Sequence, residues 1–170
     1  KLVVILDFEK IVSDINPETG LKVSDMDSYE KRDRSNSPIL IAEDSPLLSK
    51  LICECLRKAG YTNLIVNMNG QEAWDKLCEM KERGTVLDDV HCIITDIEMP
   101  LMDGHRLTKL VKENEVMKKI PVVIFSSLIN EEIRLKGESL GADAQLTKPE
   151  IGKLVSAIDG LIEKYEAGRK

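Results

Sequence analysis

Three carboxylates follow two apolar stretches of the chain, at the points where those stretches end. Glu43 and Asp44 come directly after residues 39–42, and Asp96 closes the run from 91 to 96. Such runs are typical of buried strands, and parallel strands present their carboxyl ends at one edge of a sheet. Two carboxylates about 4 Å apart repel by about 4 kcal/mol at an effective dielectric of about 20, and Mg²⁺ relieves this repulsion because it prefers oxygen ligands. The pattern therefore predicts a Mg²⁺ site that contains a nucleophile, Asp96.

A hydroxyl group and an ammonium group follow two further apolar stretches. Ser126 ends the run that begins at Pro121, and Lys148 follows residues 144–147. Phosphoryl transfer needs mainly positioning and neutralisation of the phosphoryl oxygens, so a metal ion, a lysine and a hydroxyl donor are sufficient to support it. A carboxylate nucleophile is already ionised and needs no general base. We therefore expect Asp96 to receive a phosphoryl group.

Each of these residues also has an ordinary structural explanation. Asp96 can open a loop through a hydrogen bond to the backbone, and Glu43 and Asp44 suit the start of the helix that follows them. Ser126 can cap the next helix, and Lys148 can be a solvated lysine. All five side chains, however, are expected at the carboxyl ends of strands, where open α/β sheets bind their ligands. That common position favours one shared site.

From residue 38 to about residue 166 the chain resembles the receiver domain of two-component response regulators. The resemblance rests on four ordered motifs: Glu43-Asp44, the D-x-x-M-P-x-M-D-G loop at 96–104, Ser126 five residues after Pro121, and Lys148-Pro149. It implies that Asp96 accepts a phosphoryl group from a histidine kinase, and that Ser126 and Lys148 bind the phosphoryl oxygens. It also implies that Glu43, Asp44, Asp96 and the backbone carbonyl of Glu98 hold Mg²⁺. Such a domain is regulatory, and its only catalysis is its own phosphorylation and dephosphorylation.

Two residues depart from the usual receiver pattern. Gln145 stands three residues before Lys148, where receivers that signal by rotating an aromatic side chain carry Tyr or Phe. Glu98 adds an acid two residues after Asp96, at a position that varies in the family. The aromatic switch is therefore in question for this chain.

Strand-like and helix-like segments alternate along residues 38–166. Five βα units with right-handed crossovers predict a flavodoxin-like, doubly wound parallel sheet with strand order 2-1-3-4-5. We expect strands at 39–42, 64–67, up to 96, after 121 and at 144–147, and helices at about 46–59, 71–83, 105–113, 131–140 and from 151.

The segment before residue 38 has a different composition. Residues 16–37 are charged and almost without apolar pattern, which is typical of a linker. Residues 1–15 contain the apolar run Leu2–Val12 and resemble the last strand and short helix of a CheW-like coupling domain. Coupling domain, linker and receiver in this order resemble the CheV type of chemotaxis coupling protein. The resemblance implies that phosphorylation by a chemotaxis-type kinase tunes the coupling of chemoreceptors, which bind the upstream domain. An additional strand or a remnant of cloning is the alternative for 1–15.

The composition excludes several classes of partner. The net charge is −6, which disfavours nucleic acid, and no apolar run is long enough to be inserted into a membrane. The four cysteines lack zinc-site spacing and are expected to be reduced thiols of a cytoplasmic protein. A stand-alone or transcription-linked receiver is the alternative function. A more remote one is an aspartyl-nucleophile phosphohydrolase, for which Asp7-Phe-Glu9 is the nearest motif and departs from the required pattern at two positions.

Overall fold

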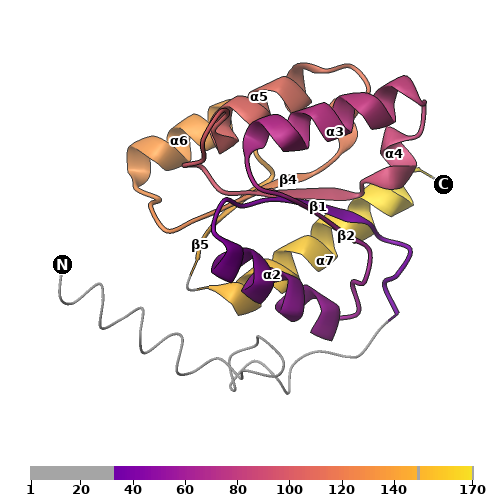
Figure 1. The fold of residues 1–170 in the computed structure, drawn as a ribbon, viewed down its shortest axis with the longest axis horizontal. Coiled ribbons are helices and arrows are strands. Elements are labelled where there is room, and N and C mark those ends of the chain that lie inside the picture. The colour runs from indigo at the N-terminus through magenta and orange to yellow at the C-terminus, as the bar shows by residue number, and fades with distance from the viewer. Residues whose placement is uncertain (1–32, 149, 170) are drawn as a thin grey trace.

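The computed structural model describes residues 33–148 and 150–169. Its sheet contains five parallel strands in the order β2-β1-β3-β4-β5, which confirms the expected flavodoxin-like topology. Figure 1 shows α2 and α7 on one face of this sheet and α3, α5 and α6 on the other. The expected coupling-domain remnant at 1–15, and the expected linker as far as residue 32, lie outside the described residues.

The strands follow the apolar runs of the sequence. They are β1 (Ile39–Ala42), β2 (Leu64–Asn67), β3 (Cys92–Thr95), β4 (Val122–Ser126) and β5 (Ala144–Thr147). Every residue of the three central strands β1, β3 and β4 is buried, whereas the edge strands β2 and β5 are mostly half-buried. Parallel strands that are covered on both faces read as continuous apolar runs. This explains why the central strands could be recognised in the sequence.

The helices begin and end within one or two residues of the expected limits. They are α2 (Pro46–Lys58), α3 (Gly70–Glu82), α5 (Gly104–Glu113), α6 (Glu131–Ser139) and α7 (Ile151–Ala167). Two short elements were not expected: α4 (Val86–Asp89) and the 3₁₀ turn η2 (Met117–Lys119). Both are too short to show helical periodicity in the sequence.

Polar side chains fix the start of four helices at the carboxyl edge of the sheet. The side chain of Ser45 accepts a hydrogen bond from the backbone of α2, Asn69 from α3, Asp103 from α5 and Asn130 from α6. Each such cap contributes typically about 1 kcal/mol because it satisfies a helix N–H group that has no intrahelical partner. The loops that carry the candidate residues therefore have fixed ends.

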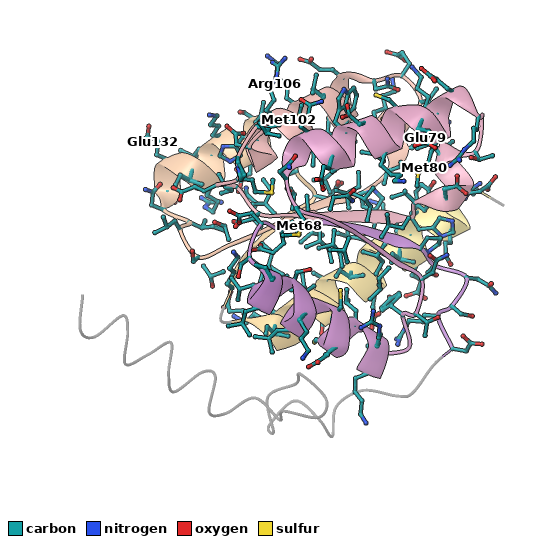
Figure 2. All side chains as sticks on the ribbon, viewed as in Figure 1. Met68, Glu79, Met80, Met102, Arg106 and Glu132 are labelled. Atoms are coloured by element: carbon teal, nitrogen blue, oxygen red, sulfur yellow. The ribbon has the colours of Figure 1, made fainter. Side chains whose placement is uncertain are left out.

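The core consists of two layers, one on each face of the sheet. Ile39 and Ile41 face α2 and α7, while Leu40 and Ala42 face α3 and α5, because successive side chains of a strand point to opposite faces. The same separation holds on the helices, where Met80 of α3 is buried and its neighbour Glu79 is exposed (Figure 2). In the part of the chain that the structure describes, no helix combines the length and the hydropathy needed to cross a bilayer.

Candidate functional site

The three acids identified in the sequence come together at the carboxyl edge of the sheet. Glu43 and Asp44 follow β1, and Asp96 follows β3, the strand that pairs with β1. One carboxylate oxygen of each lies within 4.8 Å of those of the other two. Glu43 is 1% exposed and Asp96 is 7% exposed, whereas Asp44 is exposed to solvent. The cluster is therefore half embedded in the protein and open on the side of Asp44.

Lys148 reaches this cluster from the end of β5. Its Nζ lies 2.8 Å from Oδ2 of Asp96 and 3.1 Å from Oε2 of Glu43. The backbone N–H of Lys148 donates to the carbonyl oxygen of Ser126 (3.0 Å), which anchors it to the end of β4. The sequence around Glu43 and Asp44 contains no cationic neighbour, and the fold supplies one from a distant strand.

The charges of the cluster do not balance. Burial, followed by the charge of Asp96, raises the pKa of Glu43 to about 7, although the ammonium group of Lys148 acts in the opposite direction. Burial lowers the pKa of Lys148, but its contacts with Asp96 and Glu43 outweigh burial and raise the pKa above its ordinary value. Three carboxylates, two of them buried, and one ammonium group leave an excess of negative charge in the cluster.

The donor set of this cluster fits a hard divalent cation. All three candidate side-chain ligands are carboxylates, and Mg²⁺ binds through a few carboxylate oxygens while it keeps several of its waters. A hollow of about 530 Å³ adjoins the cluster and gives room for those waters; its lining includes Asp44, Glu98 and Asp103. Glu98 lines this hollow, and a role for its backbone carbonyl as a ligand remains a prediction.

The loop after β3 holds Asp96 in one orientation. Oδ1 of Asp96 accepts a hydrogen bond from the backbone N–H of Ile97 (2.7 Å), and the N–H of Gly104 donates to the carbonyl of Ile97 (2.8 Å). A Cβ atom on Gly104 would lie 1.8 Å from the carbonyl oxygen of Asp96, so only glycine fits there. Leu101, at the tip of the loop, has φ of 67° although it is not glycine. Such strain is concentrated at functional sites.

Ser126 occupies the end of β4, between Asp96 and Lys148 in the order of the strands. It is 2% exposed, and its Oγ accepts a hydrogen bond from the backbone N–H of Leu128 (3.3 Å). Its partner in the sheet is Thr147, the residue before Lys148. The fold therefore brings all the side chains that were selected from the sequence to one edge of the sheet.

Gln145, the residue that departs from the usual pattern, lies against α6. Its Nε2 donates to the backbone carbonyl of Arg134 (2.8 Å), and its side chain covers Gly137 so closely that a Cβ atom there would lie 2.3 Å from Oε1. The amide thus occupies the space between β5 and α6.

Two features of the site were missed in the sequence. Asp103 lines the hollow and also caps α5, a role that the Asp-Gly pair before an amphipathic helix could have indicated. His105 is 5% exposed, and among the described residues its Nε2 has no hydrogen-bond partner. No pattern in the sequence signals that burial.

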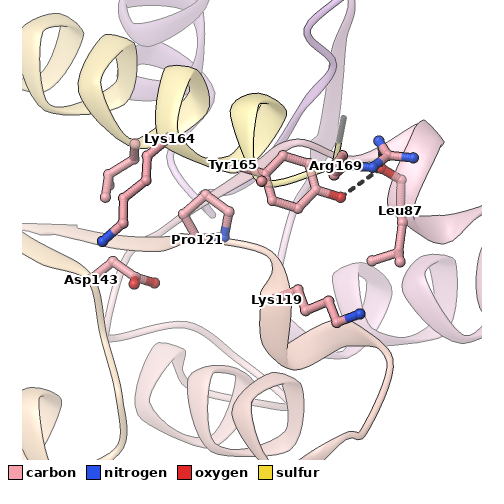
Figure 3. A pocket seen from close by; sticks show the side chains of 9 residues that line it. Leu87, Lys119, Pro121, Asp143, Lys164, Tyr165 and Arg169 are labelled. Carbon is pink, nitrogen blue, oxygen red and sulfur yellow. Dashed lines mark hydrogen bonds between the residues drawn. The ribbon is translucent and has the colours of Figure 1, made fainter.

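A second hollow, of about 600 Å³, lies near the opposite edge of the sheet. Its lining includes Leu87, Pro121 and Tyr165, and the side chains of Tyr165 and Arg169 both donate to the carbonyl oxygen of Leu87 at 2.6 Å (Figure 3). None of the residues selected from the sequence lines it. The chemistry of the side chains, and not the size of a cavity, locates the candidate site.

Comparison with known proteins agrees with this geometry. The response regulator receiver domain family matches residues 39–159. The chain is 32% identical over 149 residues to chemotaxis protein CheV1 of Helicobacter pylori, a match that covers 87% of this chain and 45% of that protein. The chain thus spans less than half the length of that relative.

Solved receiver structures share the fold. The receiver domain of a signal transduction histidine kinase from Syntrophus aciditrophicus is 30% identical, with a TM-score of 0.65 over 75% of this chain and 91% of that one. The Mn²⁺-bound form of response regulator Rcp1 is 26% identical, with a TM-score of 0.62 over 73% of this chain and 92% of that one. Because the family match covers most of the chain, this protein belongs to the response regulator receiver domain family.

Proposed function

We propose that this receiver accepts a phosphoryl group on Asp96 from a histidine kinase and thereby regulates chemotaxis signalling. The observation that supports the proposal most directly is the buried group of Asp96, Glu43 and Lys148, with Asp44 beside it at the open side. Like other receivers, the domain acts as a regulatory module, and its only catalysis is its own phosphorylation and hydrolysis of the product.

The reaction transfers a phosphoryl group from nitrogen to oxygen. The P–N bond of the phosphohistidine breaks, its electron pair returns to the imidazole, and a P–O bond forms to a carboxylate oxygen of Asp96. Lys148, which lies 2.8 Å from that carboxylate, neutralises a phosphoryl oxygen, and the hydroxyl of Ser126 donates to another. Glu43, Asp44, Asp96 and the backbone carbonyl of Glu98 would hold Mg²⁺, which when bound supplies further neutralisation of the phosphoryl charge.

The chemotaxis assignment rests on the extent of the similarity to CheV1. A match of 149 residues is longer than the stretch from Pro38 to Lys170, so it includes part of the upstream segment. This supports a receiver that continues from an upstream segment similar to that of CheV1. Within that segment we propose a linker at 16–37 and the end of a CheW-like domain at 1–15, joined to the receiver at 38–166. In this arrangement the missing upstream domain binds chemoreceptors, the kinase is of the chemotaxis type, and the protein acts in the cytoplasm.

Phosphorylation of Asp96 can be tested by intact-mass measurement. Incubation with Mg²⁺ and acetyl phosphate should add the mass of one phosphoryl group to the wild type, and Asp96→Asn should remove this gain completely because an amide cannot accept it. Asp75→Asn, on the exposed face of α3, is the control and should behave as the wild type. Phosphorylation of the Asp96→Asn protein at the wild-type rate would contradict the assignment.

The domain arrangement needs a separate test. The gene upstream of Lys1 should encode a CheW-like domain. An initiator methionine at or immediately before Lys1 would contradict the coupling-protein assignment and leave a stand-alone receiver.

A further inference from the structure

The residues that lead into β1, 33–37, lie against α7 and the end of α2. Nη2 of Arg34 forms an ion pair with Oδ2 of Asp159 in α7 (3.0 Å), and its Nη1 donates to the carbonyl oxygen of Ala59. The guanidinium group lies over the ring of Tyr61, 5.2 Å from its centroid, and the Tyr61 hydroxyl donates to Oδ1 of Asp159 (2.5 Å). One carboxylate of α7 thus binds both the lead-in segment and the loop after α2.

A second contact lies two helical turns further along α7. Oγ of Ser37 donates to Oε1 of Glu166 (2.5 Å), and the same oxygen lies 2.9 Å from Nδ1 of His91. Asp159 and Glu166 are seven residues apart, which places them on the same side of the helix. The lead-in segment is therefore fastened to α7 at two points.

The first turn of α7 is connected to the phosphoacceptor site. Thr147, the residue before Lys148, donates from its hydroxyl to Oε2 of Glu150 (2.8 Å), immediately before the helix. Lys148 binds Asp96, so a movement of Lys148 toward a phosphoryl oxygen would displace the start of α7. The helix links the carboxyl edge of the sheet to the segment that joins the receiver to the rest of the protein (Figure 1).

The far end of α7 is held in place. Tyr165 and Arg169 donate to the carbonyl oxygen of Leu87, next to the hollow of Figure 3. A displacement of the first turn therefore becomes a tilt about this end. Asp159 lies in the middle of the helix and would move in such a tilt, whereas Glu166 is next to the held end and would keep its position.

We propose that α7 is the docking surface for residues 33–37, and that phosphorylation of Asp96 loosens the contact of Arg34 with Asp159 while it leaves the contact of Ser37 with Glu166 intact. The regulatory half of this inference rests on the proposed phosphorylation of Asp96. The side chains of Arg34 and Asp159 are only 14% and 28% exposed, so water compensates poorly for a lost contact and a small tilt has a large effect.

The docking can be measured without phosphorylation, by limited trypsin digestion of the full chain. Trypsin must bind the Arg34 side chain to cleave after it, so docking protects this bond, and the product that begins at Ser35 is followed by mass spectrometry. Asp159→Asn should speed this cleavage about tenfold, as expected for the loss of a charged hydrogen bond. The asparagine keeps an acceptor for Tyr61. Glu163→Gln, one turn further along α7 at an exposed position, is the control and should change nothing. Equal cleavage of the two variants, both folded by circular dichroism, would overturn the docking.

The regulatory half needs the same digestion with Mg²⁺ and beryllium fluoride as a phosphoryl mimic. Cleavage after Arg34 should become about threefold faster or more in the wild type and stay unchanged in Asp96→Asn, as expected if about 0.7 kcal/mol or more is lost from the contact. Hydrogen exchange at the Ser37 end of the segment should stay the same. An unchanged cleavage rate in protein that binds the mimic would overturn the coupling. Failure to bind the mimic would count against the proposed function as well, while the result with Asp159→Asn would still decide the docking.

Discussion

At the carboxyl edge of the sheet, three carboxylates share one ammonium group among the described residues, whereas three ion pairs at the amino edge each join one cation to one carboxylate. Glu43, Asp44 and Asp96 lie together with Lys148. At the other edge, ion pairs join Arg34 to Asp159 (3.0 Å), Lys112 to Asp143 (2.8 Å) and Arg169 to Asp88. Paired charges stabilise the fold. An unpaired excess of negative charge has to be compensated by a bound cation.

The two histidines differ in the same way. At the amino edge both ring nitrogens of His91 have partners, Glu166 at 2.9 Å and Arg169 at 3.2 Å. His105, at the start of α5 near the carboxyl edge, is equally buried, but within the described part of the chain its Nε2 has no partner. His105 thus leaves one buried polar atom unsatisfied near the candidate site, and violations of this kind are expected at functional sites.

The largest effect is expected from Lys148→Met at the carboxyl edge. Removal of the shared ammonium group should lower the rate of phosphoryl transfer to Asp96 by about 10²–10³, the usual loss for one donor to a developing oxyanion. Phosphoryl incorporation from acetyl phosphate measures this rate. Lys109→Met is the control, because Lys109 is an exposed residue of α5. Equal rates for the two variants would show that the ammonium group is structural, as at the amino edge.

A smaller effect is expected from Asp44→Asn on the affinity for Mg²⁺. Two unit charges about 4 Å apart interact by about 1 kcal/mol in water and about 4 kcal/mol at an effective dielectric of about 20, so affinity should fall about tenfold or more. Calorimetric titration measures it, with Glu163→Gln as the control. If both variants bind Mg²⁺ equally, the excess of charge does not form a metal site.

The third prediction concerns the pH dependence of the free energy of unfolding and the contribution of His105 to it. Burial, followed by the charge of Lys136, lowers the pKa of His105, while Asp103 acts in the opposite direction. Because the unfolded state then binds the proton more readily, the free energy of unfolding should fall as pH drops below the ordinary pKa of about 6.5. Urea denaturation at pH 7.5 and 5.5 should show a smaller fall for His105→Leu. Equal falls in the variant and the wild type would assign the effect to other groups.

The smallest effect is expected at the amino edge, from Tyr61→Phe. The loss of the hydroxyl that donates to Asp159 should lower the free energy of unfolding by about 1.5 kcal/mol, since hydrogen bonds to charged groups are worth about 1.5–3 kcal/mol. Tyr165→Phe removes a bond to the neutral carbonyl of Leu87 and should cost less. Phosphoryl transfer should stay unchanged in both variants. A slower transfer in folded Tyr61→Phe would show that the Tyr61 hydroxyl acts on the phosphoacceptor site and not on stability alone.

The sequence by itself determined the strands and the residues at their ends. The runs 39–42, 64–67 and 144–147 appear as strands with the expected limits. The central run 39–42 is continuously apolar because a parallel strand buried on both faces must be. The acids after β1 and β3 were recognisable for the same reason, since a charge that interrupts such a run marks the end of a strand. The expected order of strands followed from the alternation of strands and helices and the fixed handedness of crossovers.

Only the tertiary structure decided which groups touch. Lys148 lies 52 residues from Asp96 in sequence, but its Nζ lies 2.8 Å from Oδ2 of Asp96. The two residues meet because β3 and β5, separated only by β4, end at the same edge of the sheet. The short elements α4 and η2, the buried Nε2 of His105 and the docking of Arg34 on Asp159 likewise left no pattern in the sequence. Periodicity reports which side of an element is buried, whereas contacts between distant side chains depend on how the loops and helices are placed around the completed sheet.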